Sequence, residues 1–318
     1  MRAPKFADIE QAHERIRSSV HRTPVLSSST LNRILNCELH FKCENLQKVG
    51  AFKFRGACNA VLLLTDEEAA RGVCTHSSGN HAAALALAAA MRGIPAYIVM
   101  PRTAPEIKKQ AVAGYGGQIT FCEPTLEARE NTLAKIAAET GATEIHPYHN
   151  FDVICGQGTA AKELIEDAGP FDVILCPVGG GGLLSGTAIA TRAMNPSALV
   201  VAAEPAGADD ACRSFHQKKL IPSVNPKTIA DGLLTSVGEL NFRIIQRTTD
   251  EIVTVSERGI VRAMRLIWER MKIIVEPSSA VPLAAILENK LDVRGKKVGI
   301  ILSGGNVDLE KLPFHEFV

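Results

Sequence analysis

Several short segments of the sequence contain residues whose types and spacing suit them to catalysis or ligand binding. The first segment surrounds a lysine. Residues 50–57 read GAFKFRGA and place Lys53 between two phenylalanines. An apolar setting disfavours the charged ammonium, lowers the pKa of the lysine, and makes the neutral amine a nucleophile and a base. Most lysines beside aromatic residues are surface residues with their stems along the core. Lys53 is therefore a candidate for a covalent role that needs support from other motifs.

The second segment is a run of four glycines between a predicted strand at 171–178 and a predicted helix at 183–192. Bare backbone at a helix N-terminus can converge several N–H groups on an oxyanion, which the helix dipole also favours. A plain turn is the alternative, but four successive glycines cost more chain entropy than a turn requires. The run matches neither G-x-G-x-x-G nor a P-loop, which favours a compact phosphate ester over a dinucleotide. The predicted phosphate site consists of Gly179, Gly180, Gly181 and Gly182.

Two further polar segments stand at predicted ends of elements. Residues 77–81 read SSGNH and lead into a predicted Ala-rich helix at 80–92. The serines could cap this helix, or hydroxyls and backbone N–H groups could cradle a carboxylate, and both roles are compatible. Residues 303–306 read SGGN and follow a predicted strand at 297–302. Ligands of open α/β sheets bind at the carboxyl ends of strands, so Ser303 could face a ring nitrogen, with a plain loop as the alternative.

The elements that must position these residues alternate between strand and helix signals. Short Val- and Ile-rich runs separated by helix-length segments predict βαβ units and parallel sheets, and thus an α/β fold. The chain has 318 residues, which is comfortable for two lobes. We expect a large domain of residues 1–71 and 150–318 and a small inserted domain of residues 72–149. The predicted strands are 94–100, 118–122, 171–178, 199–203 and 297–302, and helices are predicted at 80–92, 125–140 and 259–271.

Bulk composition narrows the partners and the compartment. The net charge is +1, so there is no electrostatic case for nucleic acid or a membrane surface as a partner. No apolar run approaches the roughly 20 residues of a membrane span, and the N-terminus lacks a signal-peptide core. The eight cysteines are scattered without C-x-x-C or zinc spacing, which indicates a reducing, cytoplasmic location.

Together the motifs resemble the serine racemase and threonine/serine dehydratase family of fold-type-II pyridoxal-phosphate (PLP) enzymes. The resemblance runs from HRTP at 21–24 through GAFKFRGA, THSSGNHA, GQGT and GGGG to SGGN at 303–306. It implies two open, twisted, mostly parallel sheets with flanking helices, as in tryptophan synthase β. The related sulfhydrylases typically have a GTGGT-like loop where this chain has GGGGL, so the dehydratase and racemase branch is favoured.

The resemblance assigns cofactor contacts residue by residue. Lys53 would hold PLP as a Schiff base, and Phe52 would pack against the ring. Asn80 would bond the ring hydroxyl, the four glycines would hold the phosphate, and Ser303 would share a hydrogen bond with the pyridine nitrogen.

The same resemblance assigns substrate contacts. Ser77 and His81 would help bind the substrate carboxylate, and Arg129 would reach it when the small domain closes. Ser78 matches a second acid/base on the opposite face of the ring from Lys53. Glu276, in the segment EPSSA, lies in a family segment near the cofactor. Its carboxylate is either catalytic or a cap for the following helix.

An acidic turn at 204–210 is a candidate cation site. Hard divalent cations take carboxylate and backbone oxygens, although a solvated acidic loop is the default interpretation of such a sequence. In the racemases that the chain resembles, the matching segment binds Mg²⁺ or Ca²⁺. The equivalent ligands here would be Glu204, the Ala208 carbonyl and Asp210.

We expect a PLP-dependent ammonia-lyase that converts L-threonine or L-serine to a 2-keto acid and ammonia by β-elimination. A serine at the ring nitrogen makes a weaker electron sink than an aspartate would, which suits elimination or reprotonation. Serine racemase with side elimination and a lyase for threo-3-hydroxyaspartate are the alternatives. Tyr148 favours the lyase, because racemases of this family often carry Asn there. A nucleotide-binding protein without PLP is disfavoured, because it leaves Lys53 and SSGNH without a role.

The resemblance also predicts a homodimer, and it leaves regulation by a nucleotide open. The chain ends soon after SGGN, so feedback inhibition through a C-terminal regulatory domain is not expected.

Overall fold

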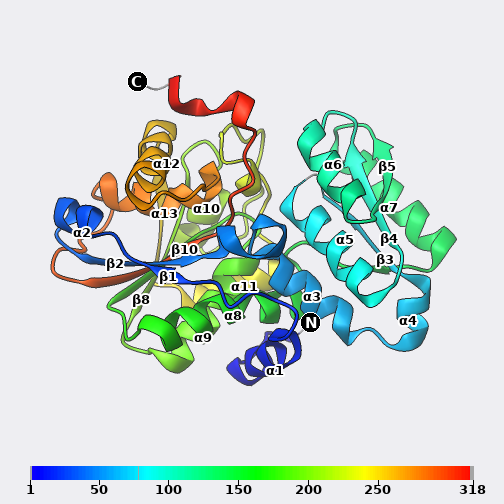
Figure 1. Cartoon of the computed structure of the whole chain (residues 1–318), viewed down its shortest axis with the longest axis horizontal. Coiled ribbons are helices and arrows are strands. Elements are labelled where there is room, and N and C mark those ends of the chain that lie inside the picture. Colours follow the sequence, from blue (N-terminus) through cyan, green and yellow to red (C-terminus); the bar gives the residue numbers. More distant parts are fainter. Residues whose placement is uncertain (1, 78, 316–318) are drawn as a thin grey trace.

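The computed structural model describes residues 2–77 and 79–315, and Ser78 is therefore outside the described part. Its strands form two separate sheets (Figure 1). Every pair of neighbouring strands is parallel except the first two of the larger sheet, so the predicted α/β fold is confirmed. In spatial order the six-stranded sheet contains β1 (Val25–Leu26), β2 (Glu38–Cys43), β10 (Lys297–Leu302), β7 (Val173–Pro177), β8 (Leu199–Pro205) and β9 (Glu251–Val255).

The four-stranded sheet lies wholly within the segment 72–149, for which a small domain is predicted. Alternate residues of its central strands face two different helical layers, as the period of two in a strand requires. Ile98 packs with α5 and α6, whereas Val99 packs with α7 on the other face. The spatial order is β5 (Gln118–Cys122), β4 (Ala96–Pro101), β3 (Val73–His76) and β6 (Thr143–Glu144), flanked by α5 (Asn80–Arg92), α6 (Glu106–Gly114) and α7 (Leu126–Thr140).

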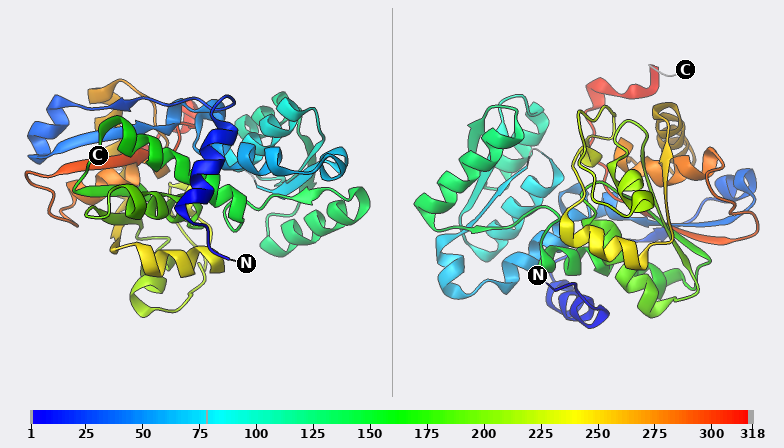
Figure 2. Two further views of the ribbon diagram at one scale, coloured as in Figure 1. Left: turned by 90° about the horizontal axis from the view of Figure 1, so that it is seen from below. Right: turned by 180° about the vertical axis from the view of Figure 1, so that it is seen from behind.

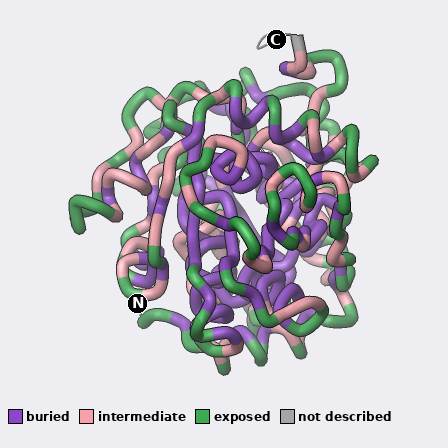
Figure 3. Tube along the Cα trace, turned by 90° about the vertical axis from the view of Figure 1, so that its left-hand side faces the viewer, coloured by how far each residue is buried: buried purple, intermediate pink, exposed green. Residues whose placement is uncertain are grey.

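Helices cover both faces of the six-stranded sheet as well, and the buried residues form a core on each side (Figures 2 and 3). One core joins the sheet to α2 (Ser29–Leu35), α12 (Glu257–Met271) and α13 (Pro277–Leu287). The other core joins it to α1 (Phe6–Ile16), α8 (Phe151–Ala168), α9 (Gly182–Met194), α10 (Asp210–Gln217) and α11 (Glu239–Thr248).

Helix α3 (Lys53–Leu63) joins the two halves of the molecule, and α4 (Asp66–Arg71) follows it. Phe54 and Ala57 of α3 are fully buried in the same core as Leu85 of α5 and Ile98 of β4. A second side of α3 packs against α8, where Gly156 gives close approach: a Cβ there would lie 2.5 Å from the Arg55 carbonyl oxygen. The helix that begins at Lys53 therefore belongs to the packing of both sheets.

Most predicted elements are confirmed, with small differences at their ends. Strands 118–122 and 297–302 and the helix at 80–92 occur with the predicted bounds. The strand predicted at 94–100 begins two residues later, at Ala96, because Gly93 closes α5 in the left-handed conformation and the chain then turns into the sheet. None of the helices in the described part of the chain is both long and apolar enough to cross a membrane.

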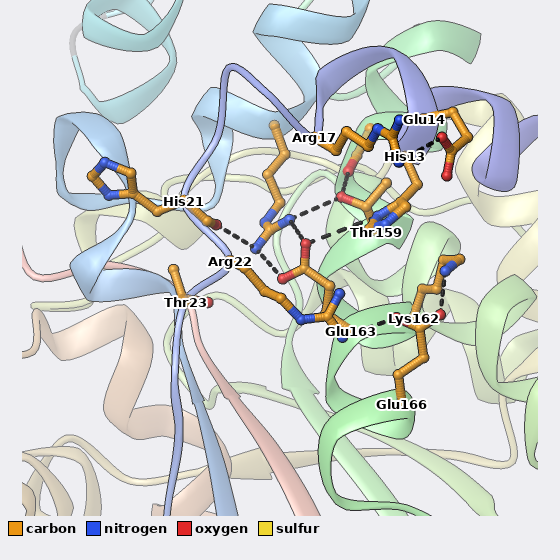
Figure 4. A network of polar contacts seen from close by, with 12 residues as sticks. His13, Glu14, Arg17, His21, Arg22, Thr23, Thr159, Lys162, Glu163 and Glu166 are labelled. Atoms are coloured by element: carbon orange, nitrogen blue, oxygen red, sulfur yellow. Dashed lines mark hydrogen bonds and ion pairs between the residues drawn. The ribbon is translucent and has the colours of Figure 1, made fainter.

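A buried ion cluster around Glu163, which is labelled in Figure 4, fixes α3 against α8 and the end of β2. Arg55 Nε lies 2.7 Å from Glu44 Oε2, and Arg55 Nη2 lies 2.8 Å from Glu163 Oε2. Lys42 Nζ lies 2.7 Å from the same Glu163 oxygen. All four side chains are at most 2 % exposed. Burial opposes the charge of Arg55, but Glu44 and Glu163 outweigh it and raise the pKa of the guanidinium.

Replacing Arg55 with alanine should strongly destabilise the protein, because Glu44 and Glu163 would stay buried without that partner. Breaking such a cluster costs about 3–5 kcal/mol. The control is Arg265→Ala, because Arg265 pairs with Glu269 on the surface of α12 and such pairs contribute at most about 1 kcal/mol. Urea unfolding of the apoprotein measures both values, and equal losses in the two variants would contradict the buried role.

Candidate active site

Lys53 is the first residue of α3 and its amine lies inside the molecule. Lys53 Nζ donates to the Pro147 carbonyl oxygen at 2.9 Å and lies 5.2 Å from the centre of the Phe52 ring. Burial lowers the pKa of Lys53 to about 8, and the charge of Glu276 only partly offsets this effect. An amine with this pKa is neutral far more often near physiological pH than a free lysine is, and a nucleophile and a base both require the neutral form.

The SGGN loop lies beside the loop that leads to Lys53. The Phe52 N–H donates to the Ser303 carbonyl at 3.0 Å, so the end of β10 and the start of α3 are bonded directly. Ser303 is 3 % exposed, and its Oγ lies 3.2 Å from Ser279 Oγ. Ser279 directs its single hydroxyl proton to the Gly304 carbonyl at 2.7 Å. Ser303 therefore donates to Ser279 or keeps its proton for a ligand.

The four glycines connect β7 to α9 and their backbone N–H groups have no protein acceptor among the described residues. Gly181 adopts a left-handed conformation with φ of 87°, which favours glycine. A Cβ on Gly180 would lie 2.3 Å from the ring of Tyr148. The Gly180 carbonyl accepts from Asn241 Nδ2 at 2.8 Å, which fixes the loop with its N–H groups free. Free N–H groups at the start of a helix bind an anion such as phosphate.

Helix α5 begins at Asn80 within the SSGNH segment, and Ser77 does not cap it. Gly79 is the N-cap, and its N–H donates to Ser77 Oγ at 3.4 Å. His81 is 2 % exposed, and its Nε2 lies 2.9 Å from the Ile145 carbonyl, so Nε2 carries the proton. Burial, followed by the charge of Lys53, lowers the pKa of His81 to about 3. The ring is neutral, so only the backbone N–H of His81 is available to a carboxylate.

Arg129 on α7 has no partner for its charge among the described residues, and its Nε is buried. Burial lowers the pKa of the neighbouring His76, while the charge of Glu130 opposes this shift and that of Arg129 adds to it. The His76 ring lies 6.1 Å from that of His146, which in turn lies 4.6 Å from that of Tyr148. A series of aromatic rings thus runs from the vicinity of Arg129 to the glycine loop. In the sequence, His146 is marked only by the segment HPYH at 146–149. The neighbours of its ring are far away in the chain or set by the fold, so only the tertiary structure reveals them.

Glu276 is the residue for which the sequence left a catalytic role and a helix cap open. The residue stands at the N-cap position of α13, but its side chain makes no capping bond. Instead, Asn80 Nδ2 donates to both Glu276 oxygens, at 3.0 and 3.1 Å. Glu276 is 4 % exposed, and burial, with help from Asp231, raises its pKa to about 7. The alternative of a simple helix cap is therefore wrong.

A cavity of about 580 Å³ adjoins the site and is lined by Gly50, Asn80 and Asn306 among others. Lys53 and the glycine loop are absent from its lining, so it borders the predicted cofactor site and does not contain it. At the rim, Lys108 of α6 forms an ion pair with Asp231 of the 3₁₀ helix Asp231–Leu233. This pair connects the helices of the small sheet to the larger half of the molecule.

The candidate cation ligands lie together where β8 ends and α10 begins. Glu204 and Asp210 are each 1 % exposed. Burial raises the pKa of Glu204 to about 9 and that of Asp210 to about 6. The Glu204 oxygens accept from the Cys212 and Ala211 N–H groups at 2.6 and 3.3 Å. No group of three or more His, Cys, Asp or Glu side chains suited to a metal occurs among the described residues, so a third protein ligand would be a backbone oxygen.

This geometry is that of a PLP enzyme, and comparison with known proteins agrees. The model of the family "Pyridoxal-phosphate dependent enzyme" matches residues 16–304, and the chain belongs to this family. The chain is 52 % identical to a beta-hydroxyaspartate dehydratase of Paracoccus denitrificans over 99 % of its length and 100 % of the relative. It is 53 % identical to a serine racemase of Dictyostelium discoideum over 96 % of its length and 95 % of the relative. The solved maize serine racemase superimposes with a TM-score of 0.95 at 46 % identity, covering 97 % and 95 % of the two chains.

The residues present fit the cofactor. A glycine loop with free N–H groups suits the phosphate, and a buried amine with a lowered pKa suits the aldehyde. The hydroxyl of Ser303 and the amide of Asn80 supply polar contacts that a pyridine ring with a hydroxyl group needs. The predicted PLP enzyme is thus confirmed at the level of the family, while the roles of individual residues are proposals.

Titration of Glu276 should make the stability of the apoprotein depend on pH. Its folded pKa of about 7 exceeds the ordinary value of 4.5. The folded state therefore binds the proton more tightly, and this contribution is complete below pH 4.5 and disappears as the pH rises through 7. Thermal unfolding from pH 5 to 8 should show a larger decline for the wild type than for Glu276→Gln. Parallel curves for the two proteins would contradict the raised pKa.

Proposed function

We propose that the protein is a PLP-dependent ammonia-lyase for 3-hydroxy amino acids. L-serine and L-threonine are candidate substrates, and 3-hydroxyaspartate is the one that the site favours. The observation that carries this choice is Arg129, a cation whose buried Nε has no acceptor among the described residues. A substrate with a second carboxylate would supply the missing acceptor. The similarity to a beta-hydroxyaspartate dehydratase supports the same choice.

We assign roles to the cofactor-binding residues that their positions support. When bound, PLP supplies an electron sink for the charge that forms at the substrate Cα. Lys53 would anchor the cofactor, and its neutral Nζ would take the Cα proton of the substrate. The glycine N–H groups hold the phosphate, and Phe52 packs against the ring. Asn80 donates to the ring hydroxyl, and Ser303 faces the ring nitrogen.

The substrate-binding residues orient the substrate and thus its β-hydroxyl, which is the leaving group. Ser77 and the backbone N–H groups at the start of α5, including that of His81, hold the α-carboxylate, and Arg129 holds the second one. Loss of the β-hydroxyl as water, followed by hydrolysis, gives a 2-keto acid and ammonia. We assign Ser78, which lies outside the described residues, as the acid/base on the opposite face of the ring.

A serine racemase is the second candidate, because the chain is 53 % identical to a protein of that name. Both reactions begin with removal of the same proton by Lys53, so they differ only in their later steps. Reprotonation by Ser78 would give the D-amino acid. The ring of Tyr148 packs against Gly180 beside the cofactor phosphate, and we propose that this aromatic residue favours elimination.

Product analysis tests the function. The pure protein is incubated with PLP, Mg²⁺ and, separately, L-serine, L-threonine and threo-3-hydroxyaspartate, and keto acid and D-amino acid are measured together. We expect keto acid from all three, fastest from 3-hydroxyaspartate. Arg129→Met should lower kcat/KM for 3-hydroxyaspartate by about tenfold to a hundredfold relative to serine, because one charge-assisted contact is lost. Substantial D-serine would favour the racemase, and an equal loss for both substrates would remove Arg129 from substrate selection.

We also propose that Glu204, the Ala208 carbonyl and Asp210 bind Mg²⁺ or Ca²⁺. Two buried carboxylates with no basic side chain bonded to them among the described residues form a site that a hard cation would stabilise. We also propose a homodimer, a cytoplasmic location, a small domain with the limits 72–149 and a nucleotide effector. The location is supported by the free state of all eight cysteines.

Millimolar Mg²⁺ should raise the melting temperature of the wild-type protein, because a ligand that binds only the folded state stabilises it. Asp210→Asn should abolish this shift. The matched control is Asp209→Asn, because the neighbouring Asp209 pairs with Arg213 at the surface and should leave the shift intact. A shift of equal size in both variants would place the cation elsewhere.

A further inference from the structure

The amide of Asn306 is fixed by an atom that can only accept. Its Nδ2 lies 2.8 Å from the Val49 carbonyl oxygen and 2.9 Å from Asn80 Oδ1. Because the carbonyl of Val49 has no proton, the nitrogen of the Asn306 amide must face it. The atom of Asn80 that receives the second proton of this amide is therefore its oxygen. The orientation of Asn80 follows from that of Asn306.

Glu276 fixes the other end of the Asn80 amide. Its two oxygens lie 3.0 and 3.1 Å from Asn80 Nδ2, and Oε2 also accepts from the Asn306 N–H at 3.3 Å. Above its pKa of about 7 the Glu276 carboxylate is ionised and only accepts, so it holds one proton of the Asn80 nitrogen. The second proton of that nitrogen has no acceptor among the described residues. It is the proton that the proposed function gives to the ring hydroxyl of PLP.

The same contacts extend to the segment that leads to Lys53. Val49 has a φ of 55°, a conformation that costs energy in a β-branched residue. The Asn306 side chain binds its carbonyl, and the Gly305 N–H donates to the Gly50 carbonyl at 2.9 Å. The strained turn before Lys53 and the SGGN loop therefore hold each other in place.

We propose that Glu276 and Asn306 are positioning residues that hold the Asn80 amide with one N–H directed at the ring hydroxyl of the cofactor. This inference rests on the placement of that hydroxyl at Asn80 in the proposed function. A carboxylate serves better than an amide at position 276, because glutamine could donate to Asn80 as well as accept and would leave Asn306 alone to orient the amide. Lys53, Asp231 and Lys108 are the charged groups that act on Glu276.

The test compares the cofactor bound by Glu276→Gln and Asn306→Asp with that bound by the wild type. PLP is added back to each apoprotein, and its dissociation constant and absorption spectrum are measured from pH 6 to 9. Each variant should bind PLP about tenfold more weakly, the loss expected for one hydrogen bond to a charged group. The ratio of the visible to the near-ultraviolet band should also change, because this ratio reports the proton on the ring hydroxyl.

Glu288→Gln is the matched control. Glu288 follows the opposite end of α13 and accepts a hydrogen bond from Ser256, so its loss should change neither the affinity nor the spectrum. Glu276→Asp keeps an acceptor-only group and should restore part of the wild-type spectrum, which a merely structural role would not predict. Wild-type affinity and spectrum in both Glu276→Gln and Asn306→Asp would overturn the inference. A visible band that survives Lys53→Ala would instead overturn the proposed cofactor site.

Discussion

The contact of Arg55 with Glu44 and Glu163 is the constraint on which the geometry of the site depends. Arg55 stands two residues after Lys53 on the first turn of α3, so the cluster that holds the guanidinium also sets where the helix begins. Buried ion pairs gain little over apolar packing, but they tolerate only one geometry. The buried cluster therefore orients α3 and with it the amine of Lys53, while the apolar residues around the cluster provide most of the stabilisation.

The electrostatics of the site depend on burial more than on paired charges. The imidazoles of His81 and His146 are neutral because burial lowers the pKa of each to about 3. Neutral rings near Lys53 add no repulsion to its ammonium and no competing base at neutral pH. Arg129 is close enough to the neutral His76 ring to act on its pKa, and the buried Nε of Arg129 has no hydrogen-bond partner among the described residues.

Local sequence signals predicted those parts of the fold that local physics determines. Gly93 and Gly141 end α5 and α7 in the left-handed conformation, and Val- and Ile-rich runs such as 297–302 form central strands. The two-residue strand β1 has no such signal, because only pairing with β2 defines it. The glycine loop could be predicted because a helix N-terminus follows it. The direction of the Glu276 side chain could not, because Asn80 and Asn306 lie 196 and 30 residues away in the chain.

Helix α3 packs in both halves of the molecule, and this shared packing couples their unfolding. Its residues Phe54 and Ala57 are part of the core of the small sheet, while Arg55 is fixed to α8 of the larger half. The small sheet cannot melt by itself without withdrawing the support of the helix that begins with Lys53. The proposed cofactor site joins Lys53 of α3 to the glycine loop of the larger half, so loss of PLP and local unfolding of the small sheet should be one cooperative event. Amide hydrogen exchange would slow in both halves of the molecule together when the cofactor binds.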